Sequence, residues 1–159
     1  MKIMYVDIAV TGHRVPYLKT LVDNSENEII VVLPEKVEGI NCKQYVCEYN
    51  NKERSLKTHK HWLDSVLKCA KKENPDIVHF LSGDNFYRYF GFGLEKFKKY
   101  KVFFTFHFVK SSLLHKISIK MISILSEKMI FHTDYLRKQA ASIGVKNAYH
   151  VEYPVFGGK

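Results

Sequence analysis

Three stretches decide the fold: PDIVHFLSGDN at residues 75–85, VFFTFHF at 102–108 and KMIFHTDYL at 128–136. Each is a short apolar run rich in strand-forming residues that ends in polar residues. Segments with helical spacing separate them. Strands that alternate with helices form parallel sheets, and the carboxyl ends of such strands open onto a common crevice. The pattern therefore predicts an α/β fold with candidate ligand-binding residues at one edge of its sheet.

The same alternation extends over the whole chain. We predict strands at residues 2–10, 28–33, 44–49, 77–81, 102–108, 128–132 and 148–151. The spacing of apolar residues predicts a helix with Pro16 in its first turn, and further helices at 55–73, 86–97, 113–125 and 134–144, the last capped by Gly144. This order indicates a doubly wound parallel sheet, Rossmann-like, in which the first and fourth strands are neighbours.

Polar residues follow the strands that we expect near the point where the strand order reverses. They lie after the first strand, after the fourth strand and at the end of the fifth. The residues that we expect to converge there are Gly12, His13, Ser82, Gly83, Asp84 and His107. Each also has a structural alternative: a buried, hydrogen-bonded imidazole for His107, and simple turn chemistry for Asp84. His79 lies inside its strand, and we expect it to bond to backbone groups.

The chain is strongly basic, with 25 Lys and Arg against 16 Asp and Glu and a formal net charge of +9. This excess favours an anionic partner such as a phosphate, a nucleic acid or an acidic membrane surface. No dinucleotide fingerprint, RNA-recognition signature, zinc-ligand spacing or helix-turn-helix accompanies the charge, so a specific nucleic-acid partner is not predicted. Non-specific polyanion binding remains as an alternative. We expect the lysine cluster at 96–101 to be a solvated loop.

Cys42, Cys47 and Cys69 fit no zinc spacing, and we expect reduced thiols that act as small buried hydrophobes in a cytoplasmic protein. His59 and His61 are two residues apart on a predicted helix and point to different sides. They are therefore excluded as a metal pair and assigned to a solvated face.

No run approaches the roughly 20 apolar residues of a membrane span, and Asp7 interrupts the apolar amino terminus, which argues against a signal peptide.

The helix at 113–125 has only a narrow polar stripe that includes Lys116 and Lys120. It either packs fully against the sheet or presents an apolar surface to an anionic membrane. We favour full burial, because a sheet face in this fold needs covering.

Four short motifs, in order, resemble the amino-terminal lobe of the GT-B glycosyltransferases, in particular the retaining family-four sugar transferases. They are PDIVH at residues 75–79, T-x-H at 105–107, MIFHTDYL at 129–136 and YPV at 153–155. The resemblance covers essentially the whole chain. Two departures are a single Gly12 where the family usually has a glycine pair, and His132 where the family commonly has serine.

The resemblance implies one Rossmann-like lobe over residues 1–152, with the start of an interlobe linker at 153–159. It implies transfer of a hexosyl unit from a nucleotide-sugar to a glycan or lipid-linked acceptor, with retention, no obligatory metal and no cofactor. The lobe alone would be inactive without the donor-binding lobe. His107 would be catalytic, and substrate would be bound by Gly12, His13, Arg14, Ser82, Gly83 and Asp84. The alternative is a stand-alone module that binds a nucleotide or a sugar phosphate. The location implied is cytoplasmic, and contact with the inner face of the membrane is left open as an option.

Overall fold

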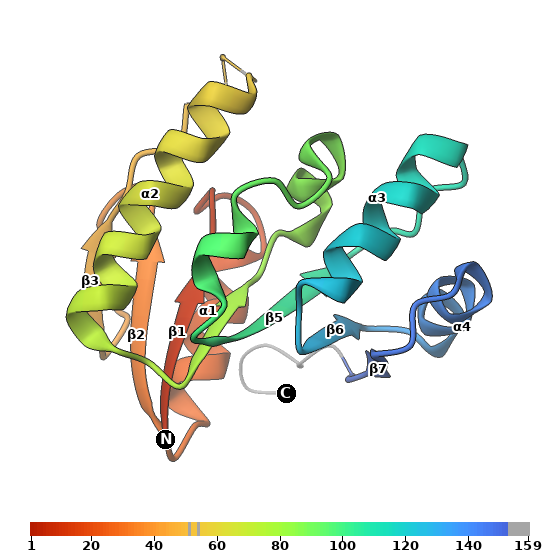
Figure 1. The fold of residues 1–159 in the computed structure, drawn as a ribbon. Coiled ribbons are helices and arrows are strands. Elements are labelled where there is room, and N and C mark those ends of the chain that lie inside the picture. Colours follow the sequence, from red (N-terminus) through yellow and green to blue (C-terminus); the bar gives the residue numbers. More distant parts are fainter. Residues whose placement is uncertain (51, 54, 153–159) are drawn as a thin grey trace. The chain divides into compact units, whose positions relative to one another are not determined.

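A computed structural model describes residues 1–50, 52, 53 and 55–152 (Figure 1). Its strands form one seven-stranded parallel sheet in the order β3-β2-β1-β4-β5-β6-β7. The order reverses beside β1, as predicted for a doubly wound Rossmann-like sheet. The chain divides into two compact units, one holding residues 1–78 and the other beginning at His79, so that β4 (Ile77–Phe80) starts in the first unit and ends in the second. The predicted linker at 153–159 lies outside the described residues.

The first unit contains β1 (Lys2–Val6), β2 (Glu28–Leu33) and β3 (Lys43–Val46), with helices α1 (Arg14–Asp23) and α2 (Leu56–Glu73). The strand β2 is almost continuously apolar and buried, as expected for an interior parallel strand. Helix α2 begins where the Ser55 hydroxyl accepts the N–H of Thr58 at 3.1 Å. It ends at Asn74, whose positive φ of 48° closes the last turn.

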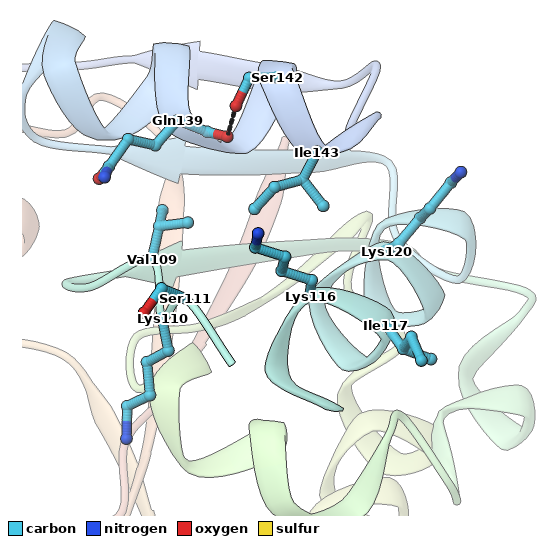
Figure 2. A pocket seen from close by; sticks show the side chains of 9 residues that line it. All are labelled: Val109, Lys110, Ser111, Lys116, Ile117, Lys120, Gln139, Ser142 and Ile143. Atoms are coloured by element: carbon cyan, nitrogen blue, oxygen red, sulfur yellow. Dashed lines mark hydrogen bonds between the residues drawn. The ribbon is translucent and has the colours of Figure 1, made fainter. Parts of the chain in front are cut away.

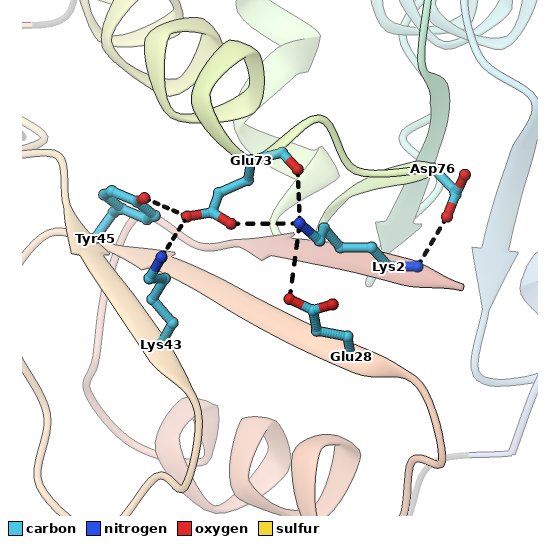
Figure 3. A network of polar contacts seen from close by, with 6 residues as sticks. All are labelled: Lys2, Glu28, Lys43, Tyr45, Glu73 and Asp76. Atoms are coloured by element: carbon cyan, nitrogen blue, oxygen red, sulfur yellow. Dashed lines mark hydrogen bonds and ion pairs between the residues drawn. The ribbon is translucent and has the colours of Figure 1, made fainter.

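A buried carboxylate ties α2 to the amino ends of these strands (Figure 3). Glu73 accepts hydrogen bonds from the Tyr45 hydroxyl and from Lys43 Nζ at 2.9 Å, and its carboxylate lies 3.5 Å from Lys2 Nζ. Hydrogen bonds from Tyr45 and Lys43 lower the pKa of Glu73 to about 2. Within the first unit, the network lies at the amino ends of the strands, whereas the loop after β1 leaves from a carboxyl end.

The second unit contains β5 (Lys101–Phe106), β6 (Lys128–Phe131) and β7 (Ala148–His150), with helices α3 (Leu113–Ile124) and α4 (Asp134–Ile143). Its core is aromatic. The ring of Phe104 stacks on Phe80 at 5.2 Å between centroids and meets Phe86 edge-on at 4.9 Å. Helix α4 ends as predicted at Gly144, whose φ of 110° is the left-handed conformation that glycine adopts without strain.

The third strand ends at Val46 and not at residue 49, and two other predicted elements differ more from the structure. The first strand ends at Val6, not at residue 10, because the carboxylate of Asp7 turns back to accept the N–H of Ile8 at 2.8 Å. The predicted helix at 86–97 is instead a pair of short 3₁₀ helices, η1 (Gly83–Tyr89) and η2 (Leu94–Phe97). Positive φ angles at Phe90, Gly91 and Gly93 break the segment between them.

Helix α3 is not fully buried, so the favoured prediction for it was wrong. Its inner face buries two serines, Ser118 and Ser123, beside Ile119 and Ile122. The Ser118 hydroxyl donates to the carbonyl of Tyr87 in η1 at 2.7 Å. The outer face carries the exposed side chains of Leu113, Leu114, Ile117, Met121, Ile124 and, just past the helix, Leu125. A surface helix usually has a polar outer face, so these exposed apolar side chains are unusual.

Candidate functional site

In the second unit, the loop after β4 holds the end of β5. One carboxylate oxygen of Asp84 accepts the backbone N–H of His107 at 2.9 Å, and the other accepts that of Phe108 at 3.1 Å. Burial raises the pKa of Asp84, against the effect of these two N–H donors. The carboxylate therefore fixes the backbone from which the half-exposed His107 side chain projects. Three of the predicted site residues, Gly83, Asp84 and His107, do come together.

Gly83 allows this close approach. A Cβ atom at this position would lie 2.8 Å from the Phe106 ring and 2.9 Å from the carbonyl oxygen of Thr105. Real Cβ atoms do not approach other atoms so closely, and the carbonyl belongs to the sheet backbone and cannot move aside. Ser82, directly before it, is buried. The loop from Ser82 to Asp84 thus lies directly against β5 because residue 83 has no side chain.

His79 is buried inside its strand, and one partner of its ring is a side chain on the neighbouring strand. Its Nε2 atom lies 2.7 Å from the hydroxyl of Thr105 on the neighbouring strand, and the whole imidazole is buried. Burial, with a smaller effect from His132, lowers the pKa of His79 to about 3. The neutral ring therefore links β4 to β5 at Thr105, two residues before His107 in the sequence.

His132 is the site residue that was absent from our predicted set. It follows β6, and its ring centroid lies 6.0 Å from that of His107. Its Nδ1 atom donates to the carbonyl of Val151 at 2.9 Å. Burial, followed by the nearby His107 and His150, lowers the pKa of His132. The sequence signal was available, because His132 stands at a strand end just as His107 does.

The remaining predicted residues belong to the first unit, in the loop after β1. Gly12 has a positive φ of 63° in open space, so this position needs glycine for its conformation and not for room. His13 is exposed and precedes α1. The Arg14 guanidinium bonds to the buried carboxylate of Asp7 at 2.6 Å, which orients the arginine and partly neutralises its charge.

The two histidines of α2 differ in their exposure. His61 is exposed, as predicted, whereas His59 is buried beside Trp62, with ring centroids 6.0 Å apart, so the predicted solvated position of His59 was wrong. Over the described residues, no group of three or more His, Cys, Asp or Glu side chains could hold a metal ion. Within the same residues, no helix has the length and apolar content that a membrane crossing requires.

A second surface lies between α3 and α4 (Figure 2). It is a cavity of about 470 Å³ with an apolar lining from Val109, Ile117 and Ile143. Lys116 and Lys120 line it from α3, and Figure 2 shows the Lys116 ammonium pointing toward Ile143 across the cavity. Cationic side chains thus border the exposed apolar face of α3. At the carboxyl end of α3, Ile124 and Leu125 line a second hollow together with the exposed Lys98 and Lys101.

No protein-family model matches the chain, and no curated protein matches it significantly. Solved structures do match. UDP-N-acetylglucosamine 2-epimerase from Rickettsia bellii is 17% identical, with a TM-score of 0.68, over 96% of this chain and 45% of that protein. HepE from Anabaena, solved with UDP, is 11% identical, with a TM-score of 0.68, over 98% of this chain and 44% of HepE. The lipopolysaccharide outer core galactosyltransferase WaaB is 15% identical, with a TM-score of 0.65, over 98% of this chain and 46% of WaaB.

The chain therefore spans less than half the length of the structures that it matches. Together with the strand order, this identifies the fold as a single Rossmann-like lobe of the GT-B architecture. Sequence identities this low show the fold alone.

Proposed function

We propose that this chain is the acceptor-binding lobe of a retaining hexosyltransferase, which moves a sugar from a nucleotide-sugar donor to a glycan or lipid-linked acceptor. The observation that carries the proposal is the placement of His107. Its backbone is fixed by Asp84 at the carboxyl end of β5, and its ring lies beside that of His132. Ligands of doubly wound sheets bind at this edge. The fold likeness to a galactosyltransferase and to a UDP-bound protein supports the same class.

Hexosyl transfer needs a site that accommodates opposite charges as the glycosidic bond breaks. The sugar develops positive charge while the leaving nucleoside diphosphate becomes more negative. In this proposal the His107 imidazole bonds to the transferred sugar and orients it. The loop from Ser82 to Asp84 borders the acceptor pocket. A second lobe, in a longer protein, would supply the nucleotide-binding site.

We also assign substrate contacts to the loop after β1. Gly12 would lie by the donor diphosphate, with His13 beside it. The Arg14 side chain is 37% exposed while its guanidinium is held by Asp7, so the cation is oriented and partly open to solvent, and in this proposal it contacts an anionic group of the substrate.

The test uses the longest natural protein that contains these residues. Turnover of a panel of nucleotide-sugars is measured for the wild type, for His107→Ala and for His61→Ala, which changes an exposed histidine of α2. We expect His107→Ala to lower kcat about 100-fold or more with little change in thermal stability. The His61→Ala control should keep full activity. An unchanged rate for His107→Ala, or a collapse of its melting temperature, would return His107 to a structural role.

The isolated lobe gives a second test. Residues 1–159 should fold but transfer no sugar, because differential binding of the transition state needs groups from both lobes. Turnover of a nucleotide-sugar by this fragment would contradict the proposal.

We further propose that the lobe contacts an anionic membrane surface from the cytoplasmic side through α3. The helix exposes 73% of Leu113, 65% of Leu114 and 76% of Ile124, which is an unusual density of apolar surface for a helix in water. Lysines at both ends of this face match the charge of acidic headgroups, each contributing about 1 kcal/mol near the surface. Apolar side chains beside lysines are typical of helices that lie in a membrane interface.

Vesicle flotation tests this contact. Binding should require acidic phospholipid and decrease with salt, because ions screen surface charges over about 10 Å at 0.1 M. The double variant Lys116→Glu and Lys120→Glu should bind less than the matched control Lys57→Glu and Lys60→Glu, which makes the same charge change on exposed positions of α2. Equal binding to neutral vesicles, or by both variants, would contradict the membrane role. So would dimerisation through this face, detected by sedimentation and lost in Leu114→Ser.

A further inference from the structure

Two thiols meet in the first unit, on residues that have no role in the proposed glycosyl transfer. The Sγ atoms of Cys47 and Cys69 lie 3.8 Å apart, although the residues are 22 positions apart in the sequence. Cys47 directly follows β3 and is buried, whereas Cys69 lies on α2 and is half-buried. The third cysteine, Cys42, precedes β3 and has no thiol neighbour among the described residues.

The packing of α2 on β3 produces this contact. Tyr45 and Cys47 are two residues apart on an extended segment, so they share one face and are separated by about 6.6 Å. Their partners on the antiparallel-running helix, Glu73 and Cys69, are four residues apart, which is about 6 Å along the axis. The two spacings match. The Tyr45–Glu73 hydrogen bond at the end of α2 therefore sets the register that brings the two sulfur atoms together.

We propose that Cys47 and Cys69 are a site of reversible oxidation, at which hydrogen peroxide converts the two thiols into an intramolecular disulfide. In the first step the Cys69 thiol releases its proton, the thiolate attacks one peroxide oxygen and the O–O bond breaks. The departing hydroxide takes up the released proton, so a sulfenic acid and one water are formed. In the second step the Cys47 sulfur attacks the sulfenic sulfur, the S–O bond breaks, and a second water leaves with the Cys47 proton. Each peroxide accepts two electrons and each thiol loses one hydrogen.

The surroundings assign these roles to the two cysteines. The hydrogen bond with Cys47 lowers the pKa of the Cys69 thiol, with Lys72 acting in the same direction, while burial and the nearby Glu73 oppose them. The same hydrogen bond and burial raise the pKa of Cys47. The more accessible thiol is thus the better thiolate, which is the arrangement of an attacking cysteine and a resolving one. Closure to a disulfide needs the sulfurs to move from 3.8 Å to about 2.05 Å.

Mass spectrometry of the folded wild-type chain tests the proposal directly. After a short treatment with hydrogen peroxide, the intact mass should fall by two hydrogens, and two of the three cysteines should resist alkylation. Peptide mapping should place the link between Cys47 and Cys69, and dithiothreitol should reverse it. A link that includes Cys42, or oxidation of Cys69 to sulfinic acid with Cys47 still free, would overturn the proposal.

Matched variants provide the control. Cys42→Ser should form the disulfide as the wild type does, whereas Cys69→Ser should lose it and consume peroxide more slowly. In Cys47→Ser, the sulfenic acid on Cys69 should persist long enough to be trapped by dimedone. Because the mapping of the wild type needs no variant, a folding defect in any of these proteins leaves the main result intact. Equal peroxide consumption by Cys69→Ser and the wild type would assign the reactive thiol elsewhere.

Discussion

The carboxylate of Asp84 lies 2.9 Å from the backbone nitrogen of His107, so the loop after one strand holds the end of the next. The second carboxylate oxygen takes the following N–H, of Phe108. A single side chain thus satisfies two backbone donors that the sheet no longer pairs, at the point where the candidate catalytic histidine leaves the sheet.

The substitution Asp84→Asn should destabilise the fold and disturb the position of His107. The amide keeps one acceptor oxygen, but its NH₂ group would face an N–H donor. We expect a loss of about 1–3 kcal/mol in the free energy of unfolding, measured by urea denaturation. In the longer protein we expect kcat to fall as well. Wild-type stability together with wild-type kcat would show that these two hydrogen bonds are dispensable.

The substitution Gly83→Ala should cost stability through overlap with β5, since the added Cβ would lie 2.8 Å from Phe106 and 2.9 Å from the Thr105 carbonyl oxygen. Overpacking of this kind typically costs about 1–3 kcal/mol, and chemical denaturation would measure it. Adding Phe106→Leu removes one of the two contacts. The double variant should therefore lose less free energy of unfolding than the sum of the losses in the two single variants. Strict additivity would show that the loop moves away freely.

The positions of the strands along the chain were predictable because each strand has a local sequence pattern of apolar, strand-forming residues. Runs such as residues 28–33 are apolar throughout, and Ser55 and Gly144 mark helix ends by their own chemistry. The segment at 86–97 was not predictable in this way. Its apolar residues have helical spacing. The left-handed conformation at Phe90 and at the glycines after it goes with tertiary packing, because Gly91 lies close to Leu125, just past the end of α3.

The candidate site was predictable in part for the same reason. The predicted strand ends put His107 and Asp84 at one edge of the sheet. No local sequence signal shows that the carboxylate of Asp84 accepts the backbone N–H of His107, because this contact depends on the tertiary structure. The thiol pair is a similar case. Cys47 and Cys69 have no motif spacing and meet only through the register of α2 on β3.

Mild acid should destabilise the protein through His79. The folded-state pKa of about 3 lies below the ordinary value of 6.5, so the unfolded chain binds a proton that the folded chain excludes. Stability is therefore fully present above about pH 6.5 and decreases as the pH falls toward 3, by up to about 1.4 kcal/mol per pH unit. The variant His79→Gln should show a shallower decrease over this range, and His61→Gln an unchanged one. Identical pH profiles for all three proteins in urea denaturation would refute this role.

Stronger acid should act through Glu73 at the opposite edge of the first unit's strands. Tyr45 and Lys43 lower its pKa from the ordinary 4.5 to about 2, so the folded state releases a proton that the unfolded chain keeps. The stability from this carboxylate is therefore complete above about pH 4.5 and is lost as the pH falls toward 2. In Glu73→Gln we expect lower stability at neutral pH and a flatter profile between these values. Tyr45→Phe removes one of the hydrogen bonds, and its stability should lie between those of the wild type and Glu73→Gln. If Glu73→Gln instead lost stability equally at every pH, the carboxylate would contribute by packing and not by its charge.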